Sequence, residues 1–150
     1  MGFWQAVVFA KKYQPHDPFH PVGEAAVFHK AVAEKLVDLG INPRGLGLFT
    51  GLGTPLDRLG ADGFFLLGDI IVTIDVTKNP HKDCTRSRVL VTGRDIVDGF
   101  PVSSHEVAYW IQKATLHRAE KLAKQQAANR TAPGKPRQGY IPGSRRWFNR

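Results

Sequence analysis

The chain has 150 residues, 42% of them hydrophobic and 23% charged, and a formal net charge of +8. This length supports one domain whose core needs no disulfide bonds, and the composition is typical of a globular protein. No apolar run is long enough to cross a membrane, and the N-terminus lacks the basic-before-apolar order of a secretory signal. Because the single cysteine, Cys84, has no partner for an internal disulfide, we expect an intracellular, cytoplasmic protein without membrane association.

The positive charge is concentrated near the C-terminus. Residues 129–150 include six basic residues and no acidic one, which leaves +2 for residues 1–128. Proline and glycine recur there, so we expect an α/β domain over residues 1–128 and a basic arm over residues 129–150 without its own fold. Aromatic side chains among the charges favour nucleic-acid contact over a merely solubilising end. The arm residues expected to bind are Arg130, Lys135, Arg137, Arg145, Arg146 and Trp147.

The predicted elements begin with a strand or an irregular lead-in over residues 1–21, because three prolines interrupt regular structure there. Residues 23–39 predict an amphipathic helix that Gly40 stops. A short strand is expected around residues 46–50, inside a glycine-rich segment.

Two strands of a hairpin follow within residues 61–77, and a further strand is expected over residues 88–92. Ser103 and Glu106 have the spacing of a capping box, so we expect a long helix from Ser103 to about residue 128. This order predicts an α/β (α+β) domain with a central mixed sheet, in which a β-hairpin core is flanked by helices.

A two-residue turn at Gly68-Asp69 sets the register of the hairpin. It places Asp62 opposite Asp75 on one face, while the other face is wholly apolar and should be buried. Opposed carboxylates are unfavourable unless something compensates them. The compensation could be a shared proton, a basic side chain that reaches between them, or a divalent cation such as Mg²⁺ or Mn²⁺. A longer loop would shift the register and separate the two groups.

The stretch ADGFFLLGDIIVTIDVT resembles the hairpin of the PD-(D/E)XK nuclease superfamily, which includes restriction endonucleases and Holliday-junction resolvases. In that family one strand starts with an aspartate and the next ends with an acidic-X-Lys triplet. Asp62 and Asp75 match the two acidic positions, and Glu24 resembles a helical glutamate that completes the metal site. The resemblance extends to the element order over about residues 22–125 and implies a restriction-endonuclease-like fold.

The sequence departs from this family at the lysine. Thr77 stands two residues after Asp75, where the family lysine stabilises developing negative charge or orients the attacking water. Lys78 would point to the opposite face of a regular strand and could serve only if the strand ends or bulges. Lys82 could serve by swinging back from the following loop. Otherwise the domain binds nucleic acid without cutting it.

The resemblance implies a Mg²⁺- or Mn²⁺-dependent endonuclease that hydrolyses phosphodiester bonds, with DNA favoured over RNA. The implied metal ligands are Glu24, Asp62 and Asp75, and the implied catalytic set adds Thr77 and Lys78. Arg86, Arg88 and Arg94 would contact the nucleic-acid backbone. Small domains of this kind commonly form homodimers, although the sequence indicates no interface. The alternatives are a non-catalytic nucleic-acid-binding module and a structural component of a nucleoprotein particle that uses the basic arm.

Overall fold

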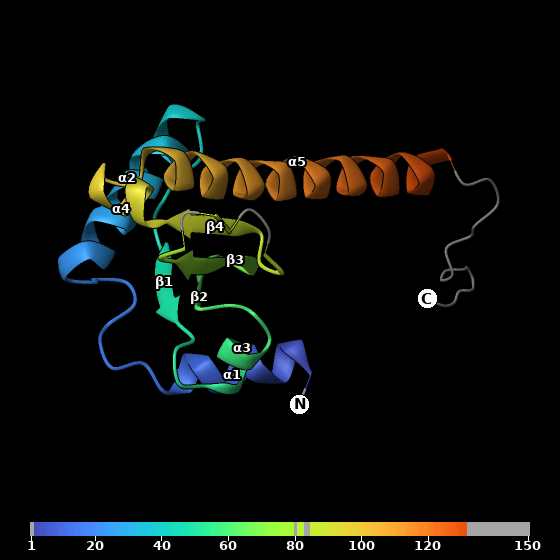
Figure 1. The fold of residues 1–150 in the computed structure, drawn as a ribbon. Helices are drawn as coiled ribbons and strands as arrows, with labels where there is room; N and C mark the ends of the chain where they lie inside the picture. Colours follow the sequence, from blue (N-terminus) through green and yellow to red (C-terminus); the bar gives the residue numbers. More distant parts are fainter. Residues whose placement is uncertain (1, 80, 83–84, 132–150) are drawn as a thin grey trace. The chain divides into compact units, whose positions relative to one another are not determined.

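The computed structural model describes residues 2–79, 81–82 and 85–131. One mixed sheet has the strand order β1 (Gly47–Thr50), β2 (Gly63–Leu67), β3 (Ile70–Thr77) and β4 (Val89–Thr92). The pairs β1–β2 and β2–β3 are antiparallel, and β3–β4 is parallel. The helices are α1 (Phe3–Lys12), α2 (Gly23–Asp38), α3 (Pro55–Arg58), α4 (Gly93–Val97) and α5 (Pro101–Thr131) (Figure 1). The predicted α/β (α+β) class with a central mixed sheet and flanking helices is confirmed.

The chain divides into two compact units, residues 1–115 and residues 116–150. The first contains the whole sheet, α1 to α4 and the beginning of α5. In the second, the described residues are the remainder of α5, which is exposed from Leu116 to Arg130. The boundary predicted after residue 128 falls inside α5, and most of the predicted arm lies outside the described residues. Within the described part of the chain, no helix is both long and apolar enough to cross a bilayer.

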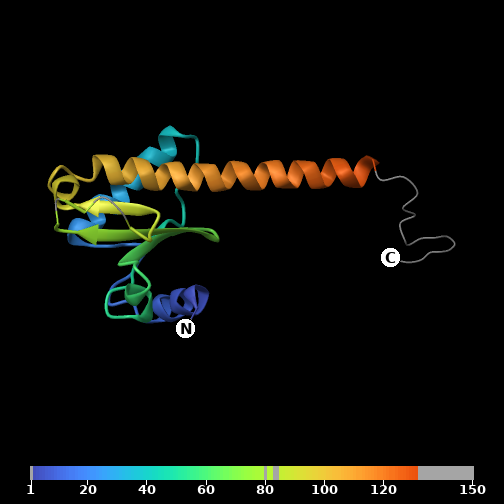
Figure 2. The ribbon, with the colours of Figure 1, turned by 45° about the vertical axis from the view of Figure 1, so that its right-hand side comes forward.

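Helices cover both faces of the sheet in the first unit (Figures 1 and 2). On one face, α2 and the start of α5 pack against the strands in a core that contains Phe28, Val32, Leu36, Phe65, Val72, Ile74, Val107 and Ile111. On the other face, α1 and α3 form a second core that contains Ala6, Val7, Ala10, Leu56, Phe64 and Leu66. The hairpin strands are therefore the middle layer of three, which explains their nearly continuous apolar sequence.

Helix α1 shows that the prediction of a strand or irregular lead-in over residues 1–21 is wrong at its beginning. Ala6, Val7 and Ala10 recur at helical spacing and are buried against the sheet. The Gly2 amide donates to Oε1 of Gln5 (2.9 Å), which satisfies one N–H at the helix start. The three prolines lie only after the end of α1, so they end the helix and do not prevent it.

The hairpin has the predicted register. Leu67 pairs with Ile70 across the turn, where Gly68 adopts the positive φ of 63° that the turn requires. On the apolar face of the hairpin, Phe65, Val72 and Ile74 are buried, Leu67 and Ile70 beside the turn are half-buried, and Val76 near the end is 40% exposed. The prediction that this whole face is buried is therefore wrong at Val76.

Helix α5 begins at Pro101, before the predicted start at Ser103. The cap comes from Asp95 in α4, whose carboxylate accepts from the amides of Val102 (2.9 Å) and Ser103 (2.8 Å). Ser103 is 1% exposed inside the helix, so the predicted capping box is wrong. An aspartate close in space has replaced the local serine because its two oxygens satisfy two amide groups at once.

Candidate functional site

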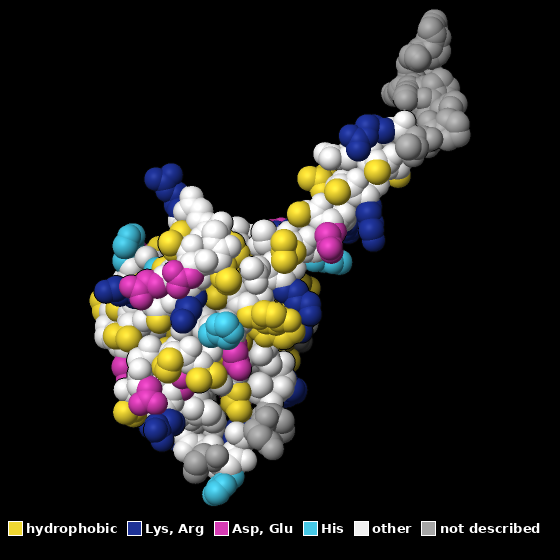
Figure 3. All heavy atoms as spheres, turned by 90° about the horizontal axis from the view of Figure 1, so that it is seen from above, with side chains coloured by type: hydrophobic (Ala, Val, Ile, Leu, Met, Phe, Trp, Pro, Cys, Tyr) yellow, Lys and Arg dark blue, Asp and Glu magenta, His cyan; other side chains and the backbone are white. Residues whose placement is uncertain are grey.

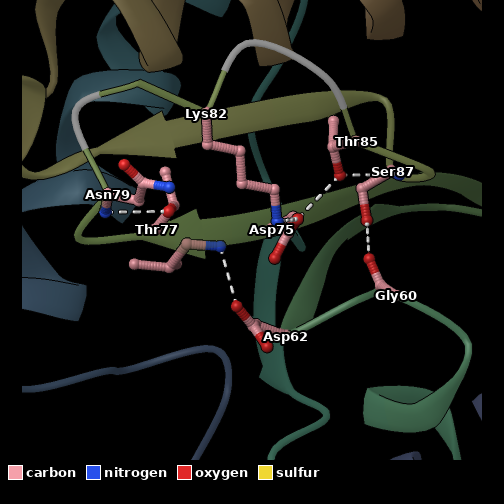
Figure 4. Close-up of polar contacts among 9 residues, drawn as sticks. Gly60, Asp62, Asp75, Thr77, Asn79, Lys82, Thr85 and Ser87 are labelled. Carbon is pink, nitrogen blue, oxygen red and sulfur yellow. Dashed lines mark hydrogen bonds and ion pairs between the residues drawn. The ribbon is translucent and has the colours of Figure 1, made fainter.

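Asp62 lies directly before β2 and is hydrogen-bonded to the strands on both sides. Its amide donates to the carbonyl of Ile74 on β3 (2.9 Å), and its carbonyl accepts from the amide of Gly51 after β1 (2.7 Å). Its carboxylate Oδ2 accepts from the amide of Val76 (2.7 Å), again on β3. These bonds hold the carboxylate beside β3, as Figure 4 shows.

Asp75 lies on β3, opposite Leu90 of β4. Its Oδ2 accepts from Nζ of Lys82 (2.7 Å) and from Oγ1 of Thr85 (2.8 Å). Both donors come from the segment between β3 and β4, and in Figure 4 the side chains of Lys82 and Thr85 point toward Asp75. The side chain of Asp75 is only 13% exposed, so water and salt screen this ion pair less than they would screen a surface pair.

The carboxyl groups of Asp62 and Asp75 lie close enough for each to shift the pKa of the other. Burial raises the pKa of Asp62, the hydrogen bond from Val76 opposes this, and the neighbouring Asp75 raises the pKa further. Burial also acts to raise the pKa of Asp75, but hydrogen bonds from Lys82, Thr85 and Asp62 outweigh it and lower that pKa. The pKa values of the two groups are therefore shifted in opposite directions. Of the three compensations expected from the sequence, a basic side chain is present: Lys82 pairs with Asp75.

A cavity of about 410 Å³ lies over the two aspartates. Its lining consists of Asp57, Gly60, Asp62, Asp75, Lys82, Thr85 and Arg86. The side chain of Arg86 packs against Gly60: a Cβ added to Gly60 would lie 3.0 Å from the Arg86 Nε. Carboxylates that could hold a cation and basic groups that could hold a phosphate thus face the same space.

The carboxylates of Asp62 and Asp75 suit a hard divalent cation that takes only some of its ligands from the protein. Within residues 2–79, 81–82 and 85–131, no group of three or more His, Cys, Asp or Glu side chains could hold a metal. Glu24 is therefore not grouped with the two aspartates; it lines a separate, larger cavity that also reaches Asp62. Mg²⁺ typically takes one or two protein carboxylates and keeps several water ligands. Asp62 and Asp75 meet this smaller requirement without Glu24.

Lys82 is the basic residue that meets Asp75. Thr77 is buried, and its Oγ1 accepts from the amide of Asn79 (3.1 Å), so it stabilises the turn after β3. Lys78 is exposed and lines the larger cavity. In the sequence, Asn79-Pro80 indicated that a lysine after the strand could reach Asp75. A proline at this place favours the end of the strand and allows the following residues to turn back toward it.

The arginines expected to bind nucleic acid have different surroundings. Arg86 lines the aspartate cavity, Arg88 lies 4.6 Å from the ring centroid of Trp110, and Arg94 pairs with Asp98 (3.1 Å). Arg130 lies on α5 in the second unit. The remaining predicted residues, Lys135, Arg137, Arg145, Arg146 and Trp147, lie outside the described residues. On the face drawn in Figure 3, basic and acidic side chains of residues 1–115 are interspersed and form no continuous basic surface.

Sequence reasoning missed three residues around the site. Thr85 binds Asp75, the Ser87 hydroxyl donates to the carbonyl of Gly60 (2.7 Å), and Asp57 contributes to the raised pKa of Asp62. No periodic pattern marks such loop residues. Only the pairing of β3 with β4 brings the connection between them back to the site.

The chain matches no family model, no curated protein and no solved structure. Its relation to the PD-(D/E)XK superfamily stays a prediction from the hairpin residues, and its function must be argued from the site.

Proposed function

We propose that this protein is a metal-dependent nuclease whose active site consists of Asp62, Asp75 and Lys82. The observation that carries the proposal is the meeting of two coupled carboxyl groups with an ammonium group. Lys82 Nζ lies 2.7 Å from Asp75 in the cavity that Asp62 also lines. An acidic pair with an adjacent lysine is the grouping that the hairpin resemblance implies, here with the lysine supplied by a loop.

The arrangement of elements supports the same proposal. The helix α2 precedes three antiparallel strands, and β4 then adds parallel to β3 before α5. This is the element order that the resemblance implies, with a connection in place of a helix between β3 and β4. The site lies at the hairpin, where the resemblance expects it.

Asp62 and Asp75 would hold Mg²⁺ or Mn²⁺, which when bound lowers the pKa of an attacking water and neutralises charge on the phosphate. The amide of Val76 and the hydroxyl of Thr85 fix the two carboxylates through hydrogen bonds that a ligand need not disturb. Lys82 places a positive charge beside the position where negative charge develops during phosphoryl transfer. Arg86, on the rim of the same cavity, supplies a planar group suited to phosphate oxygens.

Cleavage assays test the proposal directly. Duplex, branched and single-stranded DNA and RNA are incubated with Mg²⁺, Mn²⁺ or chelator, and the wild type is compared with Asp75→Asn. Asp98→Asn is the matched control, because Asp98 is exposed and pairs only with Arg94 among the contacts described. We expect metal-dependent cutting that Asp75→Asn abolishes and Asp98→Asn retains.

Absence of cutting by the wild type would contradict the nuclease. If salt-sensitive binding to nucleic acid persisted, the protein would be a binding module instead. Removal of residues 132–150 is a separate test of the two functions. A nuclease should keep its metal binding and some cutting, whereas a binder that depends on the arm should lose most of its affinity.

A further inference from the structure

A second cavity, of about 640 Å³, lies beside the aspartate cavity within the first unit. Its walls are mainly apolar and include Phe28, Phe49, Phe100, Ile74, Val91 and Ile96. Three apolar side chains on its lining are strongly exposed: Val22 (65%), Leu52 (62%) and Val76 (40%). A concave, apolar space of this size with exposed apolar residues is the usual form of a site for an organic ligand.

The two cavities meet at Asp62, which lines both. Val76 lines only the larger cavity, and its amide donates to the Asp62 carboxylate at the boundary between the two. A strand with one phosphate beside Asp62 and Asp75 would therefore place a neighbouring nucleotide at the larger cavity.

The chemistry of the lining suits a nucleobase. Apolar and aromatic walls accept the flat faces of a base, while phosphate and sugar would lose hydration there without compensation. The polar residues of the lining that the aspartate site does not use include Glu24 and Lys78, besides Gln14, His16, Asp17 and Thr50. A carboxylate can accept from an exocyclic amino group of a base, and an ammonium group can pair with a backbone phosphate.

We propose that the larger cavity binds one unpaired nucleobase of the substrate strand, next to the phosphate cut at Asp62 and Asp75. This inference rests on the proposed nuclease function and specifies its substrate. A base in a duplex must leave the stack to enter such a cavity, and this costs least where the base is already unpaired. The substrate class is therefore single-stranded or locally unpaired nucleic acid.

The test uses single-stranded oligonucleotides of one sequence in which an abasic residue is moved along the chain. Binding is measured by fluorescence anisotropy in chelator, and cutting is measured separately with Mg²⁺. We expect one position, adjacent to the cut, where the abasic residue weakens binding by about tenfold or more. Deoxy and ribo versions of the series identify whether the base belongs to DNA or RNA.

Ala25→Trp fills the cavity, because Ala25 is a half-buried residue of its lining on α2. This variant should bind the intact and the abasic oligonucleotide with equal, weak affinity. Val27→Trp is the matched control, since Val27 lies on the same helix, is 50% exposed and lines neither cavity. If Ala25→Trp does not fold, as judged by circular dichroism, Val76→Glu tests the same cavity from β3.

The two measurements separate the proposals. Cutting without an abasic penalty at any position would overturn the base site and leave the nuclease standing. A position-specific penalty without cutting would support the base site and contradict the nuclease. Ala25→Trp that folds and keeps the full penalty would show that the base binds elsewhere and would also overturn this inference.

Discussion

Lys82 Nζ lies 2.7 Å from Oδ2 of Asp75, although the two residues are seven positions apart along the chain. The connection between β3 and β4 makes this possible because it ends in a strand parallel to β3 and must pass back over it. The ion pair is the contact on which the proposed chemistry depends most directly.

Lys82→Ala should reduce the rate of cutting by about 100-fold or more, because it removes a positive charge beside the developing negative charge. The measurement is single-turnover cleavage under saturating Mg²⁺. Lys30→Ala is the control, since Lys30 is exposed on α2 and lines neither cavity. If the cleavage rate of Lys82→Ala stays within roughly threefold of the wild-type rate, the lysine has a structural role only, because substitutions away from an active site commonly have effects of this size.

Metal binding should weaken as the pH falls. The raised pKa of Asp62 means that a proton competes with the cation at a pH above the ordinary aspartate range. Titration calorimetry with Mn²⁺ across a pH series measures this loss, and buffers of different ionisation enthalpy count the protons released. Asp62→Asn should bind Mn²⁺ more weakly and lose this pH dependence. An affinity that stays constant down to the ordinary aspartate range would contradict the coupling.

The amide variants of the two aspartates should change the free energy of unfolding in opposite directions. The lowered pKa of Asp75 gives a stabilisation that is present above the ordinary aspartate pKa and is lost as the pH falls through the lowered value. Asp75→Asn should therefore be destabilising by about 1 kcal/mol at neutral pH and nearly neutral in acid.

The raised pKa of Asp62 has the opposite effect on stability. Its contribution to the free energy of unfolding is greatest below the pKa of the unfolded state and decreases as the pH rises through the pKa of the folded state. Asp62→Asn should thus stabilise the fold at neutral pH, since the side-chain oxygen of the substituted residue can still accept from the backbone amide of Val76. Chemical denaturation at neutral and acidic pH checks both variants. Equal effects of the two substitutions would show that the carboxylates do not interact.

Asp95→Ala should lower the free energy of unfolding by about 1–2 kcal/mol, because two amides at the start of α5 lose their acceptor. Thermal and urea unfolding of the variant give this value. Asp98→Ala removes an exposed partner of Arg94 nearby and should cost at most about 0.5 kcal/mol. Similar losses for the two variants would argue against the cap.

Gly63→Ala should destabilise the sheet by about 1–3 kcal/mol, because the added Cβ would lie 2.6 Å from the carbonyl oxygen of Phe49 on β1. Gly93→Ala is the control: its Cβ meets no atom within 4 Å, and alanine favours the helix it begins. Urea denaturation should therefore show a loss for Gly63→Ala and no loss for Gly93→Ala.

The sequence predicted the parts of the fold that depend on local periodicity. The register of the hairpin followed from the Gly68-Asp69 turn, and the alternation of side chains brought Asp62 and Asp75 together. Helix α2 was predicted from its apolar spacing and ends within one residue of the expected position. These features are determined by residues close together in the chain.

The features that sequence reasoning missed depend on contacts between distant residues. Asp95 caps α5 only because α4 packs before it. Helix α1 is an exception, because it did carry a local signal, the helical spacing of Ala6, Val7 and Ala10, which are buried against the second face of the sheet. Lys82 is different, because the sequence already indicated that it could turn back from the loop, and the pairing of β3 with β4 accounts for this return. Propensity and spacing carry no record of the contact with Asp95, so a local capping box was predicted in its place.

The loop origin of Lys82 affects how relatives of this protein can be recognised. The carboxylates are fixed to the sheet by backbone hydrogen bonds, whereas the ammonium group arrives on a connection whose length can change by insertion or deletion. Selection on such a site would preserve the arrangement of charges in space and leave the number of intervening residues free to drift. A search for an acid and a lysine at fixed spacing would pass over these sequences, while a comparison of side-chain positions in three dimensions would find them.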